Sequence, residues 1–118
     1  MSSYLNIVSV DQLMEQVSES DLYPQLITQL QKDLNRAGID YEVNQNANPK
    51  ELFVEIEQLL LEKLNNAFND FLNLLYAVDV SERDIKNCQS DESTVIAKYA
   101  TFLILKREWQ KVCFRNTL

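Results

Sequence analysis

Apolar residues recur at helical spacing along most of the chain, and this pattern predicts an all-α protein. Five helices are expected, at residues 10–18, 21–37, 49–76, 81–88 and 91–115. Three of them are long and two are short, which indicates a single compact helical bundle over residues 1–118, with residues 1–9 as an N-terminal arm. The alternating stretch 39–43 has no second strand to pair with, so we expect an extended connector there.

Residues with known boundary preferences mark the ends of these helices. Ser9 stands where an N-cap is needed, and Asn48-Pro49 supplies an N-cap followed by proline at the first helical position. Gly38, the only glycine of the chain, follows the helix 21–37. We therefore expect Gly38 to end that helix in the left-handed conformation and not to form part of a ligand loop.

The segment 49–76 is predicted to form one helix about 40 Å long. Its apolar face is broader than a usual stripe, because Val54, Leu61 and Leu72 lie on its shoulders. A face of this width indicates a central position in the bundle or a subunit interface. We therefore predict that a homodimer along helix 49–76 is the first contact to test.

Composition removes many kinds of chemistry. The chain has 118 residues, a formal net charge of −7 and no histidine. Catalysis by Ser-His-Asp or Cys-His groups and metal sites with a histidine ligand are excluded. A single glycine also excludes the glycine-rich phosphate loops. No metal or other cofactor and no small-molecule substrate is predicted.

The cysteines and the apolar runs bear on location. Cys88 and Cys113 lie outside any CxxC or zinc spacing, and neither has a base nearby in the sequence. We expect reduced, structural cysteines in a cytoplasmic protein. The chain start lacks the pattern of a secretory signal, and no apolar run approaches the roughly 18 residues of a membrane span.

Charge is divided unevenly along the chain. Residues 1–97 carry 17 acidic and 6 basic side chains, a balance of −11, whereas residues 98–118 carry 5 basic and 1 acidic, a balance of +4. The basic end interleaves cations with an aromatic residue, and its members are Lys106, Arg107, Trp109, Lys111 and Arg115. Such a mixture occurs on nucleic-acid-binding surfaces, but the acidic remainder disfavours that partner. Compensation of the helix dipole, with Trp109 in the core, is the preferred interpretation. Together with Val54, Leu61 and Leu72 these residues form the candidate interaction surface.

Helix 49–76 offers two further candidates. Glu57 lies among apolar positions, where burial would raise its pKa and suit it to acid–base work; the alternative is a solvated or ion-paired carboxylate. The polar side of the helix carries Glu62, Asn65, Asn66, Asn69, Asp70 and Asn73. Oxygen ligands for a hard cation are one interpretation of this set, but only two members are charged, which favours a solvated face.

Two segments, Leu74–Glu82 (LLYAVDVSE) and Leu105–Asn116 (LKREWQKVCFRN), resemble an uncharacterised group of small bacterial all-helical proteins. The resemblance extends from about Tyr23 to the end of the chain. It implies a compact bacterial, cytoplasmic domain, and it transfers no catalytic residue, cofactor or partner.

Three hypotheses for function follow. The first is a non-catalytic protein that acts through protein–protein contacts, with the homodimer as the first of them. The second is an acidic inhibitor or immunity-type protein that masks a basic partner, supported by the balance of −11 over residues 1–97. The third is a small carboxylate-dependent enzyme, which needs a pocket around Glu57 or a thiol.

Overall fold

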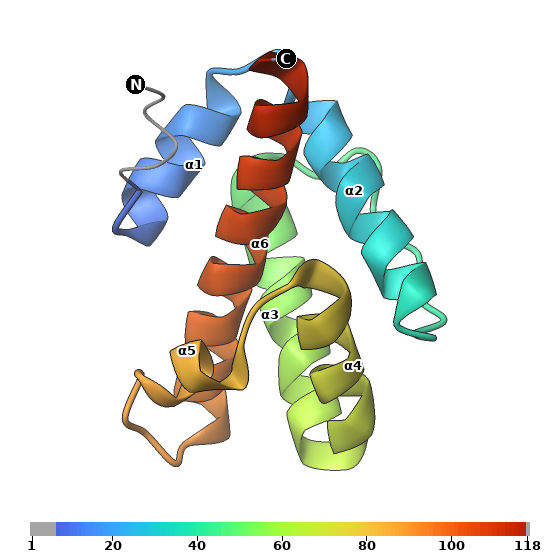
Figure 1. Cartoon of the computed structure of the whole chain (residues 1–118), viewed down its shortest axis with the longest axis vertical. Helices are drawn as coiled ribbons and strands as arrows, with labels where there is room; N and C mark the ends of the chain where they lie inside the picture. The colour runs from blue at the N-terminus through green and yellow to red at the C-terminus, as the bar shows by residue number, and fades with distance from the viewer. Residues whose placement is uncertain (1–6, 118) are drawn as a thin grey trace.

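The described part of the chain, residues 7–117 of a computed structural model, folds into α-helices joined by short loops (Figure 1). The helices are α1 (Val10–Ser18), α2 (Tyr23–Arg36), α3 (Pro49–Asn66), α4 (Phe68–Val78), α5 (Glu82–Lys86) and α6 (Ser93–Thr117). No residue from 7 to 117 is in a strand, so the all-α prediction is confirmed. Six helices are present over this range where three long and two short ones were expected.

Helix α6 runs through the middle of the molecule and packs along α3, with α2 beside it (Figure 1). In this view α1 and α5 lie on the left of α6, and α2 and α4 lie on the right. The core fills the space between the helices, and its largest fully buried side chains are Ile7, Leu13, Leu26, Leu30, Leu34, Leu52, Ile56, Leu60, Leu74, Leu75, Ile104 and Leu105. Most of the expected arm 1–9 falls outside the described residues, but Ile7 docks in the core.

The predicted single helix 49–76 is wrong, because the chain breaks at Ala67. This residue has φ −152° and ψ 63°, which no helix accommodates, and α4 then turns back to pack against α3. The preceding Asn65 and Asn66 have low helix propensity, so the break costs little locally. Folding back buries Phe71, Leu74, Leu75 and Val78 of α4. The broad apolar face expected from the sequence is therefore the sum of the faces of two helices.

Boundary signals that act locally are confirmed. The Ser9 hydroxyl accepts a hydrogen bond from the backbone N–H of Gln12 at 3.2 Å. Asn48 and Glu51 form a reciprocal capping box at the start of α3. Gly38 has φ +79°, and the N–H of the next residue, Ile39, donates to the carbonyl of Leu34 at 3.0 Å. This is the Schellman arrangement in which glycine follows a helix.

The connector 39–48 has neither helix nor strand, turns at residues 45–46, and is fixed to the helices by side chains. Gln31 accepts from the N–H of Val43 and donates to the carbonyl of Tyr41, both at 2.8 Å. The Tyr41 hydroxyl donates to Glu55 on α3 at 2.7 Å. Ile39 and Val43 are buried, which confirms a connector anchored by its apolar residues. Among the described residues, no helix has the length and apolar character needed to span a membrane.

Replacing Gly38 with alanine is expected to lower the free energy of unfolding by about 1 to 2 kcal/mol, because an L-residue pays a backbone cost at positive φ. An added Cβ would meet no atom within 4 Å, so steric clash adds nothing. Gly38→Asn should cost less, since asparagine tolerates this conformation. Urea denaturation of the three proteins measures the difference, and equal stability of all three would contradict the assigned turn.

Candidate functional site

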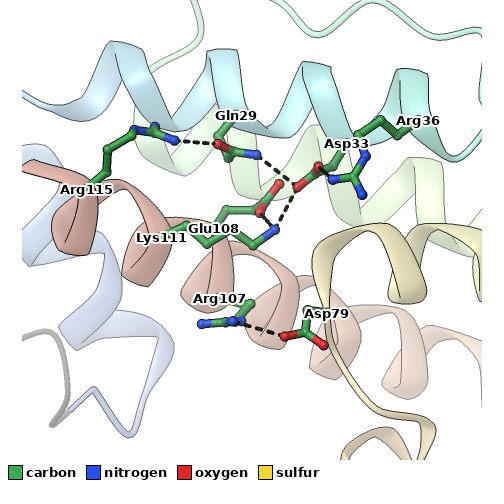
Figure 2. Close-up of polar contacts among 8 residues, drawn as sticks. All are labelled: Gln29, Asp33, Arg36, Asp79, Arg107, Glu108, Lys111 and Arg115. Atoms are coloured by element: carbon green, nitrogen blue, oxygen red, sulfur yellow. Dashed lines mark hydrogen bonds and ion pairs between the residues drawn. The ribbon is translucent and has the colours of Figure 1, made fainter.

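Two buried carboxyl groups meet between α2 and α6 (Figure 2). Asp33 and Glu108 have 0% exposure. Lys111 Nζ lies 2.9 Å from Asp33 Oδ2 and 2.9 Å from Glu108 Oε1. We call these three residues the carboxyl cluster.

The helical spacing of the two segments brings this cluster together. On α6, Glu108 shares its face with the buried Leu105 and Val112, so that face carries it into the interior, and Lys111 follows one turn later. On α2, Arg36 pairs with Asp33 Oδ1 at 3.0 Å from one turn away. The residues Gln29, Asp33, Glu108, Lys111 and Arg115 form a continuous row between the helices (Figure 2).

Burial and the neighbouring carboxyl separate the pKa values of the two acids. Burial, followed by the hydrogen bond with Asp33, raises the pKa of Glu108 to about 9. Burial also pushes the pKa of Asp33 upward, but hydrogen bonds from Glu108, Lys111 and Gln29 outweigh it and hold that pKa below its usual value. Glu108 is therefore protonated at neutral pH, and Asp33 carries the charge that Lys111 neutralises.

The surroundings of Glu108 agree with a neutral acid. Within residues 7–117 its one cationic neighbour is Lys111 at 2.9 Å, which it shares with Asp33, and Oε2 has no hydrogen-bond donor. A charged Glu108 would compete with Asp33 for this single lysine, whereas a protonated Glu108 can donate to Asp33.

A carboxylic acid with a raised pKa beside a carboxylate is also found in acid–base catalysts. Here, however, both groups are fully enclosed, and a catalytic acid has to reach the atom it protonates. The carboxyl cluster is therefore a structural link between α2 and α6. Sequence analysis missed it, although Glu108 lies on the apolar face of its helix and gave the same signal as Glu57.

The basic end of the chain is largely engaged within the fold. Arg107 pairs with Asp79 at 3.1 Å, and Arg115 donates to Gln29 at 3.0 Å (Figure 2). Lys106 Nζ lies 5.7 Å from the centre of the Phe102 ring. Trp109 is 2% exposed and belongs to the core, which leaves it outside any surface. These residues and Lys111 thus do not form one free basic patch.

The three apolar candidates of the predicted long helix are divided between two helices. Val54 on α3 is 49% exposed. Leu61 on α3 and Leu72 on α4 are partly buried and pack against the core. The structure therefore does not bring the three together on a single helix.

The asparagine-rich set surrounds the break between α3 and α4. Lys63 of α3 lies 3.5 Å from Asp70 of α4, and Asn65 accepts a hydrogen bond from the Ser93 hydroxyl at 2.9 Å. Within residues 7–117, no group of three or more acidic, cysteine or histidine side chains is placed to hold a metal ion.

The outward side of α4 carries no charged residue. Its members span an arc of about 140° on the helix, next to the buried side. They are Phe68, Asn69, Leu72, Asn73 and Tyr76, of which Leu72 is partly buried. Phe68 is 53% exposed, and the Tyr76 hydroxyl donates to Glu82 at 2.6 Å. We call this set the α4 face. Asp70, the one charged residue of α4, lies to the side and pairs with Lys63.

A groove with a volume of about 570 Å³ opens beside Glu57. Its walls come from the start of α1, from α3 and from the first half of α6. The lining residues are Val8, Ser9, Val10, Glu57, Thr94, Val95, Lys98, Tyr99 and Phe102. We call it the α1–α6 groove. Glu57 is only partly buried, and among residues 7–117 it makes no hydrogen bond or ion pair.

Both cysteines are free and partly buried, and burial raises the pKa of the Cys113 thiol. Burial therefore makes Cys113 a weaker nucleophile at neutral pH.

No protein-family model, curated protein or solved structure matches this chain. Function is therefore inferred from the chain's own geometry.

The stability of the protein should fall as the pH rises from about 5 to 9. The unfolded chain releases the Glu108 proton near pH 4.5, whereas the folded protein retains it to about 9. The free energy of unfolding is thus expected to fall by up to about 1.4 kcal/mol per pH unit in this window. Asp33 acts in the opposite sense and weakens the fold only as the pH falls below its unfolded pKa of 3.8.

Glu108→Gln should match the stability of the wild type near pH 5 and exceed it at pH 8. The free energy of unfolding of both proteins is measured by urea denaturation at each pH. The same pH dependence for the wild type and Glu108→Gln would contradict a protonated Glu108.

Lys111→Met should destabilise the protein by up to about 3 kcal/mol, because it leaves the buried Asp33 charge with Arg36 as its remaining ion-pair partner among residues 7–117, and the Arg36 side chain is 64% exposed. Lys106→Met is the matched control on the same helix, and it should cost less than about 1 kcal/mol because that ammonium only contacts a ring. Adding Asp33→Asn to Lys111→Met should restore part of the loss. Equal effects of the two lysine substitutions would show that the ion pair does not support the fold.

Proposed function

We propose that this protein is non-catalytic and acts through protein–protein contacts, first with a second copy of itself through the α4 face. The supporting observation is an uncharged, partly aromatic helix face on a chain with a net charge of −7. Solvent-facing sides of helices normally carry charged residues, and aromatic residues are enriched at interfaces.

The net charge favours this face for self-association. Two copies bring identical charges together, so an acidic surface repels itself, whereas the members of the α4 face are uncharged. The charged residues next to it, Glu82 at Tyr76 and Arg36 near Asn73, have opposite signs. In an antiparallel contact around a two-fold axis at Leu72, Phe68 of one copy would lie near the partner's Tyr76. Phe68 and Tyr76 are about 12 Å apart along the helix. The proposed contact thus involves the second half of the segment 49–76, for which the sequence predicts a homodimer.

The size of the face sets the expected strength. Helix α4 has 11 residues and is therefore about 16 Å long. Its outward side is small compared with interfaces that bury 1,200 Å² or more in total, which is roughly the lower bound for stable complexes. The dimer is accordingly weak and forms at high protein concentration.

An enzymatic role has less support. Asp33 and Glu108 are enclosed, and the Cys113 thiol has a raised pKa. A pocket does lie beside Glu57, as the enzyme hypothesis requires, but its other ionisable groups are Lys98 and Tyr99. The free cysteines agree with action in a reducing cytoplasm.

Masking of a basic protein is a second candidate function, favoured by the charge of the first helices. Residues 7–31 contain four acidic side chains and no basic one, and the four are Asp11, Glu15, Glu19 and Asp21. The negative charge of α3 nearby affects the Tyr23 hydroxyl. Burial, followed by the charges of Glu51 and Glu55, raises the pKa of Tyr23 to about 12.

Sedimentation equilibrium tests the dimer. The wild type should show a mass that rises above 13.8 kDa with concentration, and more steeply at higher salt because salt screens the net repulsion. Phe68→Glu should weaken association about tenfold or more. Phe114→Glu is the matched control, since Phe114 on α6 is 58% exposed, and it should leave association unchanged.

Asn69→Asp supplies a second variant that removes no apolar contact. The new charge lies in the first turn of α4, where the helix dipole favours an anion, so the fold is retained. It should still weaken the dimer by placing like charges across the interface. A mass of 13.8 kDa at all concentrations, or equal effects of Phe68→Glu and Phe114→Glu, would overturn the proposal.

A further inference from the structure

We infer that the α1–α6 groove binds a basic amphipathic helix of a partner protein, which places apolar side chains in the groove and a lysine or arginine beside Glu57. The inference shares with the proposed function the view that the protein acts through protein contacts. It does not depend on the dimer, because no residue of the α4 face lines the groove.

The shape and lining of the groove favour an apolar occupant. Val8 and Val95 are exposed valines in its walls, and Tyr99 and Phe102 add aromatic surface. Its volume of about 570 Å³ is in the range of roughly 300 to 1,000 Å³ found for ligand sites. It is bounded by three helices, and a hydrophobic groove between helices is the usual receptor for the apolar side of a partner helix.

Glu57 sets the charge of the occupant. It is partly buried among these apolar residues and, within residues 7–117, has neither a hydrogen bond nor an ion pair. An apolar occupant without a cation would cover this carboxylate and leave it uncompensated, which is costly. A cation on the occupant would instead pair with it in surroundings that water no longer screens.

The sequence around the groove strengthens the same preference. Asp91 and Glu92 directly precede the α6 wall in the chain, and both are exposed. Asp11 follows Val10 in the chain, but it lines another pocket, together with Glu15 and Lys50. Lys98, the basic residue in the lining, is exposed and reaches solvent at the rim. The two acidic residues that precede this wall favour the approach of a basic segment within about a Debye length.

The basic end of α6 in a second copy of this chain is a poorer occupant. Arg107, Lys111 and Arg115 are already bound to Asp79, Asp33 and Gln29. Such a contact would also join two different surfaces, the groove of one copy and the end of α6 of the next. It would therefore produce open chains of molecules instead of a closed dimer.

Titration of the full chain with a synthetic amphipathic peptide tests the inference. The probe is a helical peptide with leucines at i, i+3, i+4 and i+7 and with lysines beside them. Binding is followed by calorimetry and by the fluorescence anisotropy of a dye-labelled form of the peptide. Saturable one-to-one binding is expected, weakened by salt. A peptide of the same length with glutamates in place of the lysines should bind about tenfold more weakly or not at all.

Two pairs of variants locate the binding. Val95→Asp places a charge in the groove wall and should weaken binding about tenfold or more, whereas Val54→Asp changes a valine of similar exposure outside the lining and should not; the exposures are 42% and 49%. Glu57→Gln should weaken binding of the lysine peptide several-fold. Glu42→Gln removes the same charge from an exposed loop position and should have little effect.

The outcomes separate the groove proposal from its alternatives. No binding at millimolar peptide, or equal affinities for the wild type, Val95→Asp and Glu57→Gln, would overturn the inference. Tighter binding of the glutamate peptide, or of an uncharged leucine peptide, would assign the groove to another occupant. A monomeric wild type that binds the lysine peptide would refute the dimer and leave the groove proposal in place, and a dimer that binds no peptide would do the reverse.

Discussion

The ion pair between Lys111 and Asp33 is the contact on which the arrangement of α2 against α6 depends. Two carboxyl groups in the interior are unfavourable unless one is neutral and the other is paired. Protonation of Glu108 satisfies the first condition, and Lys111 satisfies the second from a side chain that is 21% exposed. Apolar side chains in place of the carboxyl cluster could fill the same space with equal stability. The cluster therefore contributes mainly by fixing the position of α2 relative to α6. Asp33 meets Lys111, and Gln29 meets Arg115, only in one register of the two helices.

The same contacts determine which charges are left for partners. The basic end of the chain, which has a balance of +4 in the sequence, is used to hold α6 to α2 and to the loop at Asp79. The four acidic residues of the segment 7–31 have no basic residue within that segment. The acidic segment near the start of the chain is thus separated from the basic residues that hold α6 in place, and this uneven distribution favours a basic partner.

Local signals could be predicted from the sequence, whereas features that depend on packing could not. Gly38, Asn48 and Ser9 act within one turn of their own helix, and the structure has them where the sequence places them. The break at Ala67 is different, because Asn65 and Asn66 only weaken the helix. What decides the break is the burial of the α4 core residues against α3.

The carboxyl cluster and the groove show the same limit in the candidate sites. Glu108 lies on an apolar face, but its neighbours in the sequence are basic, and the balance of +4 over residues 98–118 gives no sign of a buried acid. Its partner Asp33 is 75 residues away in the chain and is brought to it by packing of α2 on α6. Glu57 was identified from its apolar surroundings, yet the groove beside it requires α1 and α6 to meet there. A charged position on an apolar face is therefore a useful signal, and only the fold shows whether it is enclosed or open.

The two proposed surfaces lie on different sides of the molecule, and this matters for how they would work together. Helix α4 lies on the right of α6 in Figure 1, and α1, which forms one wall of the groove, lies on the left. A dimer formed through the α4 face would leave both grooves open, since no residue of that face lines either of them. A partner with two basic helices would then bind the second groove intramolecularly, at an effective concentration set by the linker between its helices. Even a weak dimer would be stabilised in this way, because the bivalent partner holds the two copies together and the uncharged face adds no repulsion between them.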